Sequence, residues 1–161
     1  MNCLLTGGGG IVGSHIMFEW LHKAIVEKTV NHLYVIIRDN EKPAKQRLLA
    51  ILQDDSRPNF LNKFTLEECL EKITLIEGNL SKITKTTLEN YNFDTIIHCA
   101  GSTSLLHTND SKEIVHTQNY LITKHLLKEL PNSVTRFIYI STAYSFGIQN
   151  EKVNDCIENY K

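Results

Sequence analysis

Glycines near the amino terminus are spaced in a way that can hold a phosphate group. Gly7, Gly10 and Gly13 form a GxxGxxG pattern that follows an apolar segment and opens a predicted helix. In such a pattern the first glycine permits a tight turn and the second lets the backbone approach a pyrophosphate. The third allows the helix to pack closely on a strand. The pattern predicts a dinucleotide site in this turn.

Neighbouring residues bear on the register and the chemistry of this turn. Thr6 before the glycines favours the register given above, although Gly8 also begins a GxGxxG pattern. A phosphate loop of the ATPase type needs a Lys after the last glycine, where Ser14 stands. Because the N–H groups at a helix start attract anions, we expect Ile11 and Val12 to face the phosphates. The alternative is a glycine-rich turn that binds no ligand.

Basic residues follow the second apolar segment, at the place where an acidic residue would hold the ribose 2′-hydroxyl of NAD. Arg38 stands there, and a guanidinium group pairs well with a 2′-phosphate. Arg47 or Lys45 on the following helix can add a second positive group. These residues favour NADP as the cofactor, with NAD as the alternative if Arg38 is merely solvated and Asp39 binds the ribose.

The elements that must position these residues alternate between short apolar segments and longer amphipathic ones. The predicted strands are residues 2–6, 33–37, 73–76, 94–99 and 136–141, and the predicted helices are 12–27, 43–52, 65–72 and 111–130. Strands that are apolar on both faces suit a parallel sheet covered by helices on each side. We therefore predict an α/β fold, a Rossmann-type doubly wound parallel sheet in three αβα layers. Right-handed crossovers favour strand order 3-2-1-4-5, with a ligand crevice between the first and fourth strands.

Composition narrows the remaining function classes. A chain of 161 residues fits one domain, and its net charge of −1 gives no basic footprint for nucleic acid. Its four cysteines form no CxxC pair and its histidines show no metal-ligand spacing, so we expect no metal site. His98 and Cys99 look reactive, but we expect them to end a buried strand. No segment approaches a membrane span, and we expect a cytoplasmic protein with reduced thiols.

Further motifs lie at the ends of the predicted strands. They are the segments 77–80, 98–102 and 140–147, with Asn119 in the fourth helix. Together with residues 6–13 they resemble the extended short-chain dehydrogenase/reductase superfamily, which is epimerase/dehydratase-like. The stretch 38–48, the HCAG segment 98–101 and the STAY segment 141–144 are similar to the thioester reductase and fatty acyl-CoA reductase branch, the male-sterility type. The resemblance covers residues 1 to about 147.

This resemblance implies roles for residues at the predicted crevice. Asn79 and Leu80 would border the adenine, and Ala100 and Gly101 would lie along the ribose and pyrophosphate. Asn119 would support the active-site side of the fourth helix. The position of Asn79 is commonly Asp in these families, although an amide oxygen can still accept a hydrogen bond.

The resemblance also implies a catalytic pair that is incomplete here. Thr142 occupies the place of the catalytic Ser or Thr, with Ser141 beside it on the cofactor side. In the family a Tyr in a YxxxK motif passes the proton, and the Lys lowers the pKa of the phenol. Tyr120 with Lys124 has this spacing but precedes the strand that carries Thr142, so we interpret it as a chance match. If Tyr160 is the acid, its Lys lies beyond the last residue.

These observations lead to one leading hypothesis and two alternatives. We expect residues 1–161 to be the NAD(P)-binding Rossmann domain of a longer NADP-dependent oxidoreductase that reduces an acyl thioester or related carbonyl by hydride transfer. The substrate-binding part is then absent, and the chain alone should be inactive. The alternatives are a nucleotide-sugar epimerase or dehydratase, and a non-catalytic dinucleotide-binding module. Apolar surface that a missing part normally covers would also favour a homo-oligomer.

Overall fold

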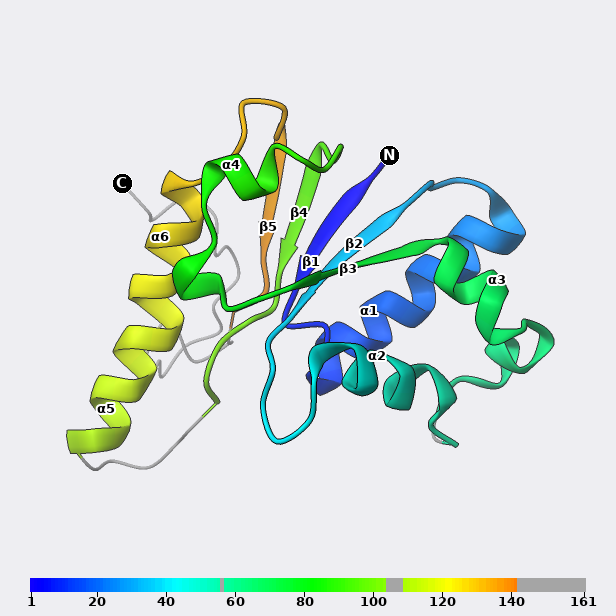
Figure 1. Cartoon of the computed structure of the whole chain (residues 1–161), viewed down its shortest axis with the longest axis horizontal. Helices are drawn as coiled ribbons and strands as arrows, with labels where there is room; N and C mark the ends of the chain where they lie inside the picture. The colour runs from blue at the N-terminus through cyan, green and yellow to red at the C-terminus, as the bar shows by residue number, and fades with distance from the viewer. Residues whose placement is uncertain (56, 104–108, 142–161) are drawn as a thin grey trace, which may run out of the picture.

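Five parallel strands form one sheet at the centre of the computed structural model, which describes residues 1–55, 57–103 and 109–141 (Figure 1). The strands are β1 (Cys3–Thr6), β2 (Leu33–Ile37), β3 (Ile73–Glu77), β4 (Thr95–His98) and β5 (Arg136–Tyr139). Their order is β3-β2-β1-β4-β5, and all four pairings are parallel. This confirms the predicted doubly wound topology and strand order.

Helices cover both faces of the sheet. One face carries α1 (Ile11–His22), η1 (Lys23–Glu27), α2 (Ala44–Gln53), η2 (Asn59–Lys63) and α3 (Leu66–Glu71). The other carries η3 (Leu80–Lys82), α4 (Lys85–Leu88), α5 (Asn109–Val115), η4 (His116–Leu121) and α6 (Ile122–Lys128). Figure 1 shows α1 to α3 on one side of the strands and α4 to α6 on the other, which makes the three predicted layers.

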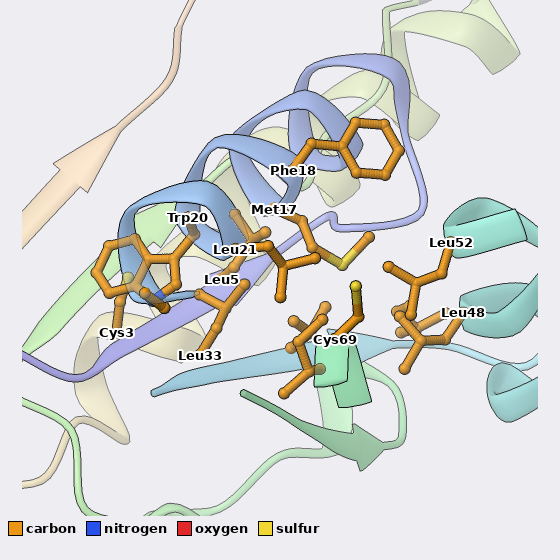
Figure 2. Packing of buried hydrophobic residues seen from close by; sticks show 14 of the residues in the cluster. Cys3, Leu5, Met17, Phe18, Trp20, Leu21, Leu33, Leu48, Leu52 and Cys69 are labelled. Carbon is orange, nitrogen blue, oxygen red and sulfur yellow. The ribbon is translucent and has the colours of Figure 1, made fainter. Parts of the chain in front are cut away.

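Two hydrophobic clusters fill the spaces between these layers. The first joins α1, α2 and α3 to the sheet, and Figure 2 shows Met17 and Leu21 of α1 facing Leu5 and Leu33 of β1 and β2. The second lies on the opposite face, where Leu126 of α6 packs with residues of β4, η3 and α4. The sheet is therefore buried on both sides, which is why its central strands are apolar at nearly every position. Within the described residues no helix is long and apolar enough to cross a membrane.

The connection between β2 and β3 is built from short helices. A capping box begins α3, since Glu68 N donates to Thr65 Oγ1 at 3.2 Å and Thr65 N donates to the Glu68 carboxylate at 2.8 Å. Between the predicted helices 43–52 and 65–72 no element was predicted, but η2 forms a 3₁₀ turn there and buries Leu61. The packing of Leu61 in the first hydrophobic cluster stabilises this turn, which the helix propensity of its residues alone does not predict.

The predicted ends of several elements are wrong by a few residues. The predicted helix 12–27 begins at Ile11 and changes to a π-helical turn at Lys23, followed by Lys28 with φ of 54°. The predicted helix 111–130 ends at Lys128 and contains the π-helical turn η4. The fifth strand ends at Tyr139 rather than residue 141, because its ladder with β4 ends there.

Candidate functional site

A cavity of about 260 Å³ opens at the carboxyl ends of β1 to β4. Thr6 at the end of β1 is in register with Ile36 of β2 and His98 of β4, so these three strands end side by side. The cavity therefore lies at the predicted crevice between the first and fourth strands. Its walls come from the glycine turn, the ends of β2 to β4, and the helices α2, η4 and α6. The lining residues are Gly7, Gly9, Gly10, Ile36, Ile37, Arg38, Arg47, Gly78, Asn79, Leu80, Cys99, Ala100, Gly101, Gln118 and Ile122.

The glycine turn is held by close backbone contacts. Gly7 has φ of +74°, and a Cβ there would lie 2.6 Å from Ala100 N. A Cβ at Gly13 would lie 2.2 Å from the carbonyl oxygen of Gly7. Gly7 therefore permits the turn and Gly13 permits close packing of α1 on it, as the GxxGxxG register requires. At Gly10 a Cβ would meet only Gly7 O at 3.5 Å, so this glycine faces open space at the cavity.

The amino end of α1 presents N–H groups that no side chain of residues 1–55, 57–103 or 109–141 caps. Its N-cap is Gly10, which has no side chain to accept from them, and its first turn contains no acidic residue. The side chains of Ile11 and Val12 are 82% and 52% exposed, so they leave this end open. Free N–H groups and the positive end of the helix dipole suit a phosphate. This arrangement fits a dinucleotide pyrophosphate.

Two arginines form the wall at the end of β2. Arg47 of α2 donates from Nη1 to the carbonyl oxygen of Arg38 at 2.6 Å, and its Nη2 lies 2.9 Å from where a Cβ on Gly9 would be. Asp39 is not among the lining residues, and its Oδ1 accepts at 2.7 Å from Ala44 N in the first turn of α2. No Asp or Glu belongs to the described lining of the cavity. The wall can thus pair with an anion.

The end of β3 supplies an apolar and an amide group. Leu80 is buried, and Gly78 before it has φ of +149°. Asn79 Oδ1 accepts from Ser81 N at 3.1 Å, which caps η3. Its Nδ2 has no hydrogen bond within the described residues. Asn79 can therefore offer a ligand a donor, whereas its oxygen, the group expected to accept, is already bonded.

The end of β4 lies beneath the glycine turn and is tied to η4. Ala100 and Gly101 line the cavity, and the next residue, Ser102, bonds Asn119 twice. Ser102 N donates to Asn119 Oδ1 at 2.6 Å, and Asn119 Nδ2 donates to Ser102 O at 2.9 Å. Asn119 does not itself line the cavity. It holds the main chain of the cavity wall in place.

His98 is the last residue of β4 and Cys99 follows it directly, one residue short of the predicted strand end. His98 is fully buried, and burial lowers its pKa to about 4. Cys99 is half-buried at the cavity wall, and burial raises the pKa of its thiol to about 11. An imidazole with so low a pKa is a weak base, and a thiol that stays protonated is a poor nucleophile. Both are part of the scaffold around the cavity.

Of the other residues singled out in the sequence, none that the structure describes lines the cavity. Ser141 is exposed two residues after the end of β5, and Thr142 and Tyr160 lie outside the described residues. Tyr120 is 53% exposed on η4, with Lys124 Nζ 5.7 Å from its ring centroid, and neither residue lines the cavity. The Nζ group thus lies over the ring. Among the described residues, no three His, Cys, Asp or Glu side chains gather as a metal site.

Several lining residues were missed from the sequence. Ile36 and Ile37 end an apolar strand, and nothing in their residue type separates a wall position from a core position. Gly9 was one of four consecutive glycines, and only its closeness to Arg47 distinguishes it. Gln118 and Ile122 lie on the helix that packs beside β4. Their spacing of four residues is a signal that could have placed both on the face of Asn119's helix turned to the cavity.

Comparisons with known proteins agree with this geometry. The family model described as male sterility protein matches residues 5–160. A thiolation-reductase di-domain from an archaeal non-ribosomal peptide synthetase has a similar structure, with a TM-score of 0.68 and 24% identity over 89% of this chain and 28% of that one. A comparison with curated protein sequences found no significant match.

Sugar-nucleotide enzymes share the same fold. A variant of UDP-glucuronic acid 4-epimerase from Bacillus cereus gives a TM-score of 0.66 at 19% identity, covering 97% of this chain and 45% of that one. A dTDP-glucose 4,6-dehydratase from Streptomyces venezuelae gives 0.66 at 19% identity, covering 94% and 42%. Both structures contain NAD. The chain spans less than half the length of each of these proteins.

Proposed function

The chain belongs to the male sterility protein family of NAD-binding domains, and from this premise we propose that it is the cofactor-binding portion of an NADP-dependent reductase acting on an acyl thioester or related carbonyl. The observation that carries the proposal is the cavity at the strand ends, where an uncapped helix start and two arginines converge. A dinucleotide phosphate has anionic groups at both of these places. The proposal treats the substrate-binding part as belonging to a longer chain.

The preference for NADP rests on the wall at the end of β2. Arg38 and Arg47 line it, while Asp39 is not among the lining residues and its Oδ1 accepts from the N–H group of Ala44. Without a carboxylate in the lining, this wall lacks the acceptor that a ribose 2′-hydroxyl needs. Two guanidinium groups instead favour a 2′-phosphate, to which they can donate several charge-assisted hydrogen bonds.

Each part of the cavity would contact a different part of the bound cofactor. The N–H groups at the start of α1 would hold the pyrophosphate, and the turn at Gly10 leaves room for it. Leu80 and Ile122 would enclose the base, with Asn79 Nδ2 as a donor to it. The bound dinucleotide supplies the hydride. We propose that Thr142 binds the substrate oxygen and that Tyr160 donates the proton.

A calorimetric titration of the 161-residue chain with NADPH and NADH tests the cofactor assignment. We expect NADPH to bind more tightly, and Arg38→Ala to remove the preference. Loss of one charge-assisted contact costs ~1.5–3 kcal/mol, which is roughly 10- to 100-fold in affinity. Arg57→Ala is the control for the loss of an arginine, because Arg57 does not line the cavity and its guanidinium donates instead to the main-chain oxygen of Leu52. Equal affinity for both dinucleotides would contradict the assignment.

A sugar-nucleotide epimerase or dehydratase is the second candidate. Its support is the fold likeness to the B. cereus epimerase, whose TM-score of 0.66 is close to that of the thiolation-reductase structure. The two candidates differ in their reactions, since the reductase consumes NADPH as it reduces an acyl thioester. In a chain extended past residue 161, NADPH oxidation driven by an acyl thioester supports the reductase. Turnover of a UDP-sugar without net cofactor oxidation supports the epimerase.

A further inference from the structure

A line of buried hydrogen bonds crosses the sheet beneath the cavity. Thr6 Oγ1 at the end of β1 lies 2.6 Å from Nδ1 of His98 on β4. The other ring nitrogen, Nε2, lies 2.8 Å from Thr123 Oγ1 on α6. Thr123 Oγ1 in turn donates to the carbonyl oxygen of Asn119 at 2.8 Å. Because Thr6 and His98 are fully buried, water does not compete for the bond between them.

The bonding fixes where each proton lies. The single hydroxyl proton of Thr123 is used on the carbonyl of Asn119, so Thr123 must accept from Nε2 of His98. A neutral ring that carries its proton on Nε2 has Nδ1 free as an acceptor. Thr6 must therefore donate to Nδ1, which leaves its oxygen to accept from Ala100 N at 3.4 Å.

Both ends of this line reach the cavity. Thr6 immediately precedes Gly7, the first residue of the glycine turn, and its hydroxyl receives the N–H of Ala100. Asn119 clamps the main chain of Ser102 with two bonds. Since a Cβ on Gly7 would lie 2.6 Å from Ala100 N, the turn and the segment 100–102 are already in contact. A change in one must displace the other.

The surroundings of His98 keep its ring in one orientation. Tyr139 stacks on it with centroids 5.4 Å apart and planes 23° apart, and Phe137 lies at 5.9 Å. Its hydrogen-bond partners are two hydroxyl groups, and burial holds its pKa near 4. The ring therefore stays neutral near pH 7 and offers one donor and one acceptor, as the line requires.

We propose that His98 is a positioning residue whose two ring nitrogens fix the glycine turn relative to the Ala100–Ser102 segment, so that both walls of the cavity stand at the distance a dinucleotide needs. Nδ1 holds the turn through Thr6, and Nε2 holds the ring itself through Thr123. The cofactor part of this inference rests on the proposed function. The geometric part concerns the free chain and is tested separately.

Two substitutions separate the two nitrogens. In His98→Asn the side-chain oxygen can take the place of Nδ1, and in His98→Gln the amide nitrogen can take the place of Nε2. We expect His98→Gln, which releases Thr6, to weaken NADPH binding about tenfold, the effect of ~1.4 kcal/mol. His98→Asn keeps Thr6 bonded and should weaken binding much less. A residue that only stabilises the fold would lower the melting temperature in both variants and leave both affinities equal.

Isosteric variants of the partners cover the case in which a His98 variant does not fold. Thr6→Val should behave like His98→Gln, and Thr123→Val like His98→Asn. The matched control is His125→Gln. Like Thr123, His125 lies on α6, and its ring bonds one group, Ile83 O at 2.8 Å, which does not line the cavity. It should leave the NADPH affinity unchanged. Folded His98→Gln and Thr6→Val variants that bind NADPH as the unaltered chain does would overturn the proposal.

Amide NMR spectra of the free chain decide the geometric part without any cofactor. We expect His98→Gln and Thr6→Val to shift the amide signals of Gly7 and Ala100, and His98→Asn to leave them near their original positions. Unshifted signals in the first two variants would overturn the positioning role. If the unaltered chain binds neither NADPH nor NADH, the proposed function fails. The amide signals then still show whether His98 fixes the glycine turn relative to the Ala100–Ser102 segment.

Discussion

Acidification should destabilise this fold through one buried imidazole. His98 has a pKa of about 4 in the folded chain, against an ordinary value of 6.5. Between these two values the unfolded chain binds a proton that the folded chain does not, so the stability falls as the pH falls. A difference of one pH unit corresponds to about 1.4 kcal/mol. The interval from 6.5 to about 4 therefore removes about 3 kcal/mol of unfolding free energy.

Urea unfolding at a series of pH values measures this loss. Trp20 is the single tryptophan and is buried in the first hydrophobic cluster, so its fluorescence reports unfolding. The informative quantity is the difference in unfolding free energy between the unaltered chain and His98→Asn, because other titrating groups cancel in it. At pH 7.5 this difference should favour the unaltered chain. It should then shrink by about 3 kcal/mol as the pH falls to 4.

A control must destabilise the same strand without removing a titrating group. Ile96→Val serves, since Ile96 is fully buried on β4 and its truncation costs roughly 0.5–1.5 kcal/mol at every pH. Among the described residues, the groups facing the His98 ring are those of Thr6, Thr123, Phe137 and Tyr139, which bring no carboxylate or ammonium group to it. A difference for His98→Asn that stays constant from pH 6.5 to 4 would refute the buried neutral ring.

Three further substitutions test the glycine turn and the capping box. Gly13→Ala should destabilise the chain by about 3 kcal/mol or more, because its Cβ would meet the backbone of Gly7 at 2.2 Å, whereas Gly10→Ala should retain the melting temperature. Similar melting temperatures for the two variants would contradict this packing. Thr65→Ala should cost about 1 kcal/mol, measured by urea unfolding, with NADPH affinity unchanged. No loss of stability would mean that the box does not hold α3.

The sheet could be predicted because its strands carry a strong local signal. Runs such as residues 33–37 and 94–99 are apolar and β-branched, and their burial on both faces requires that composition. The order followed from crossover handedness and from the glycine turn at the first strand end. The strand ends were harder to predict, because pairing is decided by the neighbour. For example, β5 ends at Tyr139 because its partner in β4, His98, is the last residue of that strand.

The sequence predicted which segments form the site, but it did not predict which of their residues bond to one another. The sequence left open whether Asp39 holds a ribose, and it gave no sign of the hydrogen bond from Ala44 N to Asp39 Oδ1. Asn119 was expected near the active site from resemblance, but its partner, the main chain of Ser102, lies 17 residues away in sequence. Such pairs depend on where η4 lies relative to the segment that follows β4. Hydrophobic spacing also gives no sign of the π-helical turn that holds Asn119.

The position of His98 follows from the winding of the fold itself. Crossovers from β1 proceed over one face of the sheet and those from β4 over the other, so the chain diverges at the ends of these two neighbouring strands. The divergence opens the cavity, but it also means that the glycine turn and the segment 100–102 leave the sheet toward opposite faces. A hydrogen bond at the base of the cavity has to hold these two segments together. Thr6 and His98 are the last paired residues of β1 and β4, which makes this the place where one side chain can hold both walls.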